Sequence, residues 1–411
     1  MSWIPMILSL SLNLKQVSRE PLIVREAGRI LQNYDYYDIN SVVFKITDKC
    51  NLGCRYCYRL NSNTRINRNA IDYSIIQRTL ESILAFKTDL YARYEIHKVP
   101  HINFIWHGGE PMLAGIQMFE SILRIQDLHK DSGLKINNII QTNGTLIDHN
   151  FIDLFKRHDF TVGISIDGPH EIQDIHRCMA GGTSSFDATL RGINLLNDNG
   201  INWSAIAVIN KEYVGHEQEI YNFFREVHPK EIDFTPSFLH NSEFTLNNQD
   251  YANFMNRMFD LWIQDLDSCF SIRYLKDLMY KMGYLRIKDK KSIICDLSGK
   301  CHRNISIFTN GDVYSCECLN TLKDNRIGNI MESEISDMIH GKRFKELSQQ
   351  TNEIHPDCIS CRDFPICKAG CFNRRVPWNG IVEKDYYCEA RKSMMMHMRM
   401  VCDRILSMEK K

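Results

Sequence analysis

Three cysteines in the first part of the chain limit its chemistry more than any other feature. Cys50, Cys54 and Cys57 stand at C-x3-C-x2-C spacing, directly after the β-branched and aromatic run Val42–Phe44. Three thiolates in one short loop form a soft, electron-rich site of the kind that holds an iron–sulfur cluster or zinc. Zinc prefers a fourth ligand, and none of the next dozen residues is Cys or His. The spacing favours a four-iron cluster with one open iron over zinc or three unrelated buried cysteines.

From residue 41 onward, short apolar runs alternate with longer segments of helical periodicity. The expected strands are Val42–Thr47, His101–Trp106, Asn138–Thr142, Thr161–Ile166, Trp203–Ile209 and Glu231–Thr235. The expected helices are Ile71–Phe86, Ile116–Leu128, Phe151–Arg157, Ser185–Asp198 and Glu217–Val227. Six such units are too few for a closed eight-unit barrel, which takes roughly 250 residues. The pattern therefore predicts an α/β fold, a partial (β/α)6 barrel over residues 41–236.

Polar loops follow several of these strands, at the end where barrels of this type carry their chemistry. The second strand leads into His107–Pro111, in which two glycines let the backbone approach a ligand and Glu110 offers a carboxylate to an ammonium group. The third and fourth strands lead into Gln141–Gly144 and Ser165–Pro169. Small polar side chains there suit ribose hydroxyls, although turn formation explains the same residues.

The cysteine triad, the aromatic Tyr56 before its third Cys and the Gly-Gly-Glu-Pro loop resemble the radical S-adenosylmethionine enzymes. In that family the open iron chelates the methionine end of S-adenosylmethionine, and reductive cleavage releases a 5′-deoxyadenosyl radical. The resemblance implies that the loop at Glu110 holds the methionine amino group, Arg177 the carboxylate, and Ser165 the ribose. The full set of residues expected at this cofactor is Tyr56, Gly108, Gly109, Glu110, Pro111, Asn143, Ser165, Asp167 and Arg177. The fifth strand, Ala205–Ile209, would face adenine or form ordinary core.

Cysteines return in the last third of the chain, at Cys295, Cys301, Cys316, Cys358, Cys361, Cys367, Cys371 and Cys388. This spacing resembles the C-terminal SPASM domain, whose implied ligand sets are Cys295, Cys301, Cys316 and Cys371 for auxiliary cluster I and Cys358, Cys361, Cys367 and Cys388 for auxiliary cluster II. Spacing alone leaves four-Cys zinc sites open. With the radical motif present, we expect three [4Fe-4S] clusters. Cys178 and Cys318 are left without an assigned role, although Cys318 is an alternative ligand.

The resemblance implies an oxidoreductase that abstracts hydrogen from a residue of a peptide or protein. Sulfatase-maturing relatives carry an Asp after the third ligand of auxiliary cluster I, as general base, whereas this chain has Glu317. The longer side chain displaces the carboxylate of Glu317 by one methylene relative to that of an Asp. This argues against the sulfatase-maturing reaction, because about 1 Å of misplacement of a catalytic group can cost 100-fold in rate. We therefore expect a peptide maturase that crosslinks side chains of a precursor peptide, with Glu317 as proton acceptor. The alternative is an anaerobic sulfatase-maturing enzyme that oxidises Cys or Ser to formylglycine, and a non-catalytic electron carrier or zinc module is a third reading.

Composition adds limits rather than a function. The 411 residues carry fifty basic and fifty acidic side chains, so no net charge indicates nucleic acid or an anionic membrane. Fifteen cysteines without an export signal or an eighteen-residue apolar stretch fit the cytoplasm, with flavodoxin or ferredoxin as electron donor. We expect four domains. Residues 1–40 form an N-terminal extension, with an edge strand or amphipathic piece at Ile7–Leu14. Residues 41–236 form the barrel, residues 237–294 a helical bridge, and residues 295–411 the SPASM domain.

Overall fold

The computed structural model describes residues 38–58, 70–239, 242–265, 268–285, 294–299, 301–318, 325–375 and 382–408. The expectations for residues 1–37, including the segment Ile7–Leu14, lie outside these ranges. Across the part of the chain that is described, no helix is both long and apolar enough to cross a membrane.

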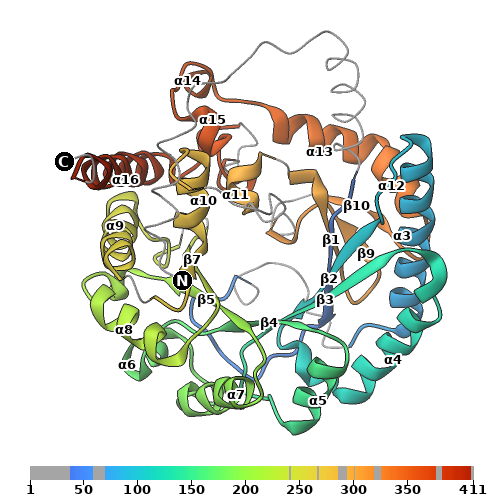
Figure 1. Cartoon of the computed structure of the whole chain (residues 1–411). Helices are drawn as coiled ribbons and strands as arrows, with labels where there is room; N and C mark the ends of the chain where they lie inside the picture. Colours follow the sequence, from blue (N-terminus) through green and yellow to red (C-terminus); the bar gives the residue numbers. More distant parts are fainter. Residues whose placement is uncertain are drawn as a thin grey trace.

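A ten-stranded sheet in the order β10-β9-β8-β1-β2-β3-β4-β5-β6-β7 forms the centre of the molecule. Its strands are β1 (Ser41–Thr47), β2 (His101–Gly108), β3 (Lys135–Thr142), β4 (Thr161–Ser165), β5 (Trp203–Ile209), β6 (Glu231–Pro236), β7 (Ser271–Ile272), β8 (Asn304–Ile307), β9 (Asp312–Tyr314) and β10 (Arg326–Asn329). Neighbours from β8 through β1 to β7 pair in parallel, whereas β8–β9 and β9–β10 are antiparallel. Figure 1 shows the strands curled into an open ring with helices outside it.

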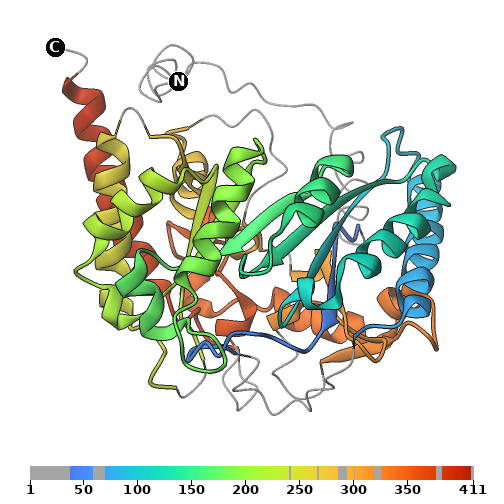
Figure 2. The ribbon, with the colours of Figure 1, turned by 90° about the horizontal axis from the view of Figure 1, so that it is seen from below.

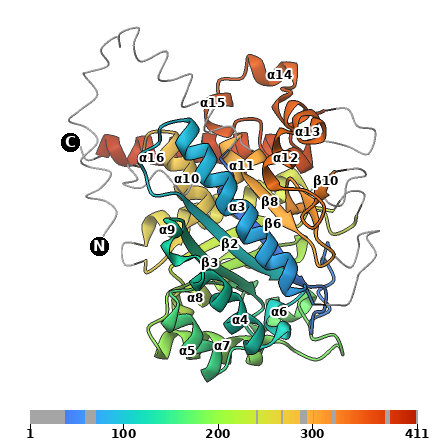
Figure 3. The same ribbon diagram turned by 90° about the vertical axis from the view of Figure 1, so that its right-hand side faces the viewer.

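The helices within residues 73–264 lie along the outside of the ring, and the helices within residues 273–298 lie at its opening (Figures 1 and 3). The helices are α3 (Tyr73–Arg93), α4 (Ile116–Asp127), α5 (His149–Arg157), α6 (His170–His176), α7 (Phe186–Asp198), α8 (Glu217–Val227), α9 (Asn248–Gln264), α10 (Arg273–Lys281), α11 (Cys295–Ser298), α12 (Ile335–His340), α13 (Lys342–Asn352), α14 (Pro356–Ile359), α15 (Phe364–Cys367) and α16 (Cys388–Met408). Asp72 and Asp148 cap the first turns of α3 and α5, because each carboxylate accepts a backbone N–H there. The long C-terminal helix α16 packs on α9 (Figure 2).

An aromatic layer joins the first strands to their outer helices. The rings of Phe44 on β1 and Trp106 on β2 stack at 4.8 Å, and Phe119 of α4 meets Trp106 edge to face. All three side chains are fully buried. Since side chains alternate along a strand, the residues that follow them, Lys45 and His107, point to the opposite face, inside the ring.

The predicted α/β partial barrel is confirmed, with a strand at each of the six expected positions and a helix at each of the five. The sheet also continues beyond the six expected strands at both of its ends. The two-residue β7 extends the sheet beside β6, and β8 adds to its other edge beside β1. β7 is too short for a periodic signal, and the pairing of β8 with β1 is a long-range contact that no local pattern carries.

Candidate active site

The three N-terminal cysteines lie in the loop that follows β1. The segment after α6 fixes this loop by backbone hydrogen bonds, from Gly53 N to Cys178 O at 2.9 Å and from Ala180 N to Asn51 O at 2.9 Å. Cys178 therefore supports the loop through its carbonyl, while its thiol donates to Asp174 O at 3.1 Å.

Two thiols of this loop, those of Cys50 and Cys54, hold their protons more tightly than an exposed cysteine does. Burial raises the pKa of Cys54 to about 12, despite the opposing charge of Arg177, and burial also raises the pKa of Cys50. Metal ligation requires thiolates, so cluster binding here releases protons and weakens as the pH falls. The site is partly buried and open enough for insertion, which fits a cluster rather than a packed core.

The Gly-Gly-Glu-Pro loop packs against the cysteine loop by backbone, which explains both of its glycines. Gly109 N donates to Thr47 O at 2.8 Å, and a Cβ on Gly109 would lie 2.1 Å from Lys49 O. Gly108 adopts a φ of 137°, and a Cβ there would lie 2.2 Å from Thr47 O. No side chain other than hydrogen fits at either position.

The Glu110 carboxylate makes hydrogen bonds within the protein, and its contact with an ammonium group stays a prediction. Glu110 is fully buried, and its carboxylate accepts Met112 N, Thr142 Oγ1 and Asn143 N at 2.6–3.0 Å. It caps the short 3-10 helix Pro111–Ala114 and ties the loop to the end of β3.

Arg177 provides a buried positive charge next to the cysteine loop. Its Nη1 lies 3.9 Å from Cys54 Sγ, and its Nη2 donates to Asp167 at 3.1 Å. Its Nε is buried and has no hydrogen-bond partner among the described residues. A buried guanidinium with a spare donor suits a carboxylate ligand, so the residues fit the methionine end of S-adenosylmethionine.

Asp167 is the buried partner of the Arg177 guanidinium. Its two oxygens accept from Arg177 Nη2, Tyr56 Oη at 2.5 Å, Tyr213 Oη at 3.2 Å and Val208 N at 2.9 Å, and the side chain is fully buried. Two carboxylate oxygens offer about four acceptor positions, and all are used. All four hydrogen bonds lie within the protein, and one of them occupies the hydroxyl of Tyr56; a direct cofactor contact from Asp167 stays a prediction.

Asn143 and Ser165 lie at the ends of β3 and β4. Asn143 Nδ2 donates to Asn51 Oδ1 in the cysteine loop at 2.8 Å, and Ser165 Oγ accepts from Gln141 Nε2 at 3.0 Å. Ser165 is partly exposed toward the ring interior and keeps its own hydroxyl proton for a ligand. Along β5, Ala205 and Ala207 are buried in the core, which leaves Ser204, Ile206 and Val208 on the other face.

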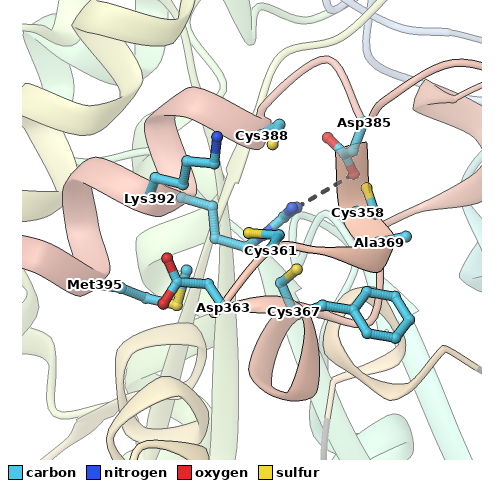
Figure 4. A pocket seen from close by; sticks show the side chains of 11 residues that line it. Cys358, Cys361, Asp363, Cys367, Ala369, Asp385, Cys388, Lys392 and Met395 are labelled. Carbon is cyan, nitrogen blue, oxygen red and sulfur yellow. Dashed lines mark hydrogen bonds and ion pairs between the residues drawn. The ribbon is translucent and has the colours of Figure 1, made fainter. Parts of the chain in front are cut away.

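Four of the C-terminal cysteines line one pocket, which is the candidate site of auxiliary cluster II. Figure 4 shows Cys358, Cys361, Cys367 and Cys388 around a common space, with Lys392 at its side. Arg391 also lines this pocket. Burial raises the pKa of Cys358 and Cys388, and the cations oppose that rise. Four thiols and neighbouring positive charge match a thiolate-ligated cluster of net negative charge.

The candidate site of auxiliary cluster I brings together cysteines that are far apart in sequence. Cys295, Cys301 and Cys371 are close enough for their charges to raise one another's pKa, with burial as the main cause. Cys318 interacts with all three and with Cys316, so the structure keeps it in the same group as a possible fifth thiol. No three metal-binding side chains among the described residues converge at single-ion spacing.

A buried network of charges links the two auxiliary sites. Asp385, 1 % exposed, pairs with Arg374 at 3.0 Å and with Arg391 at 3.2 Å, and both arginines also reach Asp296. The arginines hold the pKa of Asp385 well below its usual range, although burial opposes this shift. The same carboxylate accepts Cys371 N at 2.7 Å, which anchors one candidate ligand of cluster I.

Glu317 reaches from the second half of the chain to the inside of the ring. Its Oε1 accepts from Lys45 Nζ and Tyr58 Oη and lies 3.2 Å from His107 Nδ1. Lys45, Tyr58 and His107 were not expected at the site. The signal available in the sequence is a lysine in the middle of the apolar run Val42–Ile46.

Two family models match the chain. The radical SAM superfamily matches residues 44–224, and an iron–sulfur cluster-binding domain, SPASM, matches residues 299–362. A cysteine-type anaerobic sulfatase-maturating enzyme of Clostridium perfringens is 31% identical over 353 residues, which cover 84% of this chain and 91% of that enzyme. The chain belongs to this family of radical SAM enzymes. It is an oxidoreductase, and its cofactors are S-adenosylmethionine and [4Fe-4S] clusters.

A further sulfatase-maturating enzyme and two solved structures are also similar to this chain. A serine-type enzyme of Bacteroides thetaiotaomicron is 28% identical over 79% of this chain and 80% of its own length. The solved structure of anSMEcpe with bound AdoMet and Cp18Cys peptide superposes with a TM-score of 0.78 at 26% identity, covering 90% of this chain and 99% of that one. Streptococcus suis SuiB bound to its precursor peptide SuiA shares the fold, with a TM-score of 0.62 at 17% identity.

These relatives overturn the main functional expectation. The prediction of a crosslinking peptide maturase is wrong, because the similar proteins along most of the chain are sulfatase-maturating enzymes. The prediction gave too much weight to the extra methylene of Glu317. Its carboxylate is fixed by three neighbouring side chains, so side-chain length alone does not set its position. Family membership also excludes the non-catalytic carrier and zinc module.

Proposed function

We propose that this enzyme oxidises a cysteine or serine side chain of a sulfatase to formylglycine. The observation that carries the proposal is Glu317, a carboxylate next to Cys316 that extends to the cysteine loop and β2 inside the ring. A carboxylate there can accept the proton of a substrate thiol or hydroxyl. The similarity to both cysteine-type and serine-type enzymes supports the same reaction.

The chain offers a residue set for each cofactor. Cys50, Cys54 and Cys57 would hold the radical-generating cluster, with Arg177 and the backbone at Gly108 and Gly109 facing S-adenosylmethionine. The two sets of four C-terminal cysteines would hold auxiliary clusters I and II. When bound, these cofactors supply the removal of a hydrogen atom from the substrate β-carbon and take up the electron that is left.

A side chain of the protein accepts the proton that does not leave with the hydrogen atom. Oxidation of a Cys or Ser side chain to the aldehyde level removes two electrons and two protons. One proton leaves with one electron as the hydrogen atom, and the other, from the thiol or hydroxyl, passes to Glu317. For cysteine, water then replaces sulfur, which leaves as hydrogen sulfide. Lys45, Tyr58 and His107 hold the carboxylate in place for this transfer.

The setting of the reaction follows from the redox chemistry. We propose a flavodoxin or ferredoxin as the electron donor and the cytoplasm as the compartment, because a reducing environment keeps fifteen cysteines available for clusters.

The test uses anaerobic, iron-reconstituted enzyme with dithionite, S-adenosylmethionine and a sulfatase peptide carrying a single target Cys or Ser. We expect formylglycine, detected by mass spectrometry and by aldehyde labelling, together with deoxyadenosine. A peptide with Ala at the target position is the control and should remain unchanged. Deoxyadenosine without any aldehyde from either peptide would refute the proposed substrate, and absence of both products with about twelve irons bound would refute the reaction class.

A further inference from the structure

The side chain of Lys45 is fully buried in the strand that carries the cysteine loop. All seven residues of β1 are buried, and Lys45 has a side-chain exposure of 0 %. A lysine is almost never fully buried unless it is paired, because removing an ammonium group from water costs several kcal/mol. Its presence in β1 therefore requires partners that are specific to this place.

Those partners come from three different parts of the chain. Lys45 Nζ donates to Tyr58 Oη at 2.8 Å, lies 3.0 Å from His107 Nδ1 and is ion-paired with Glu317 Oε1. Lys45 and His107 are also direct partners in the parallel register of β1 and β2. Two strands of the barrel, the rigid part of the fold, therefore fix the position of the ammonium group.

Glu317, in contrast, follows β9, which lies between β8 and the edge strand β10. Its contacts with Lys45, Tyr58 and His107 all use Oε1. The side chain is 19 % exposed, and no hydrogen bond of Oε2 is seen among the described residues. We assign Oε2 to the substrate.

We propose that Lys45 is the positioning residue for Glu317, which it holds across the gap between the barrel strands and the C-terminal half of the chain. This inference rests on the proposed role of Glu317 as proton acceptor. Glu is longer than the Asp expected at this position, and the longer side chain has one more rotatable bond to restrict. A charge-assisted bond to an ammonium on β1 restricts it, since a displacement of about 1 Å can cost 100-fold in rate.

The experiment replaces Lys45 by Met, which matches the length of the side chain and removes its charge. We expect the ratio of formylglycine to deoxyadenosine to fall by at least about 10-fold, because hydrogen abstraction continues while the proton acceptor is misplaced. The peptide KM should change by less than about 3-fold, since Lys45 has no exposed surface with which to contact the peptide. Peptide affinity, measured by fluorescence anisotropy, and iron content should stay near the wild-type values.

Lys87→Met is the matched control. Lys87 is also fully buried and is ion-paired with Asp38, but it lies on the outer helix α3. We expect this variant to lose stability without any change in the product ratio. If Lys45→Met does not fold, Lys45→Gln, which is smaller and too short for the same ion pair, is measured in the same way.

Three outcomes overturn the inference. They are an unchanged product ratio in the Lys45 variants, a fall that Lys87→Met reproduces, and a loss that follows iron content or peptide affinity, which would indicate a purely structural role. If the wild-type enzyme forms no formylglycine at all, the proposed function fails instead, so the two failures are distinguishable.

Discussion

Arg177 and Asp167 form an ion pair of 3.1 Å whose side chains are 7 % and 0 % exposed. The pair lies directly behind the loop that carries Cys54, and the aspartate also fixes Tyr56. The guanidinium, rather than the carboxylate, faces the candidate cofactor site. We therefore expect Asp167 to act on the cofactor through Arg177.

Asp167→Asn should destabilise the protein strongly. Removing one partner of a buried ion pair leaves an uncompensated charge, which costs about 3–5 kcal/mol. Anaerobic urea denaturation measures the change. Asp89→Asn, which breaks the exposed Arg93–Asp89 pair on α3, is the control and should cost less than about 1 kcal/mol. Equal losses in the two variants would contradict the role of burial.

The buried carboxyl of Glu110 predicts a pH dependence. Burial raises its pKa to about 7, against 4.5 for an unperturbed glutamate. The folded state therefore binds this proton more tightly than the unfolded state, and the free energy of unfolding should fall as the pH rises from about 4.5 to about 7. Glu110→Gln should flatten that slope between about pH 4.5 and about pH 7. A slope that the substitution leaves unchanged would assign the effect to other groups.

The contact between the two active-site loops predicts the effect of a single methyl group. Gly109→Ala should displace Lys49 and the cysteine loop, because the new Cβ would lie 2.1 Å from a backbone oxygen. We expect a loss of about four irons per chain, the content of one cluster, measured after reconstitution. Gly181→Ala is the control, since no atom lies within 4 Å of a Cβ there and its φ is ordinary. Full iron content in Gly109→Ala would contradict the prediction.

The proposed role of Glu317 predicts that its substitution lowers the formation of formylglycine but not that of deoxyadenosine. Glu317→Gln keeps the shape of the side chain but cannot accept the proton, so the ratio of formylglycine to deoxyadenosine should fall about 100-fold or more. Glu389→Gln, on the exposed first turn of α16, should keep the wild-type ratio. An unchanged ratio in Glu317→Gln would remove this carboxylate from the mechanism.

Local sequence was sufficient for the barrel and for the cysteines. The strands from Val42 to Thr235 are buried apolar runs separated by helical segments, and each pattern depends only on neighbouring residues. The cysteine spacings are equally local. The clusters themselves were expected from resemblance, and the assignment of individual ligands stays a prediction.

Contacts between segments that are far apart in the sequence could not be predicted in this way. The carboxylate of Glu110 caps the next helical turn and binds Asn143 N. Glu317 was read from side-chain length alone, whereas Lys45, 272 residues away in sequence, fixes its position. Neither arrangement has a signature in a short window of sequence.

The parallel pairing of β8 with β1 has a consequence for biosynthesis. The two strands are separated by roughly 260 residues, which take some 13–50 s to translate at 5–20 residues per second. During that interval β1 has an unpaired edge, and Lys45 has not met the carboxylate made later. We expect β1 to reach its final packing only after β8 has been translated. A nascent chain truncated before β8 should remain bound to a chaperone.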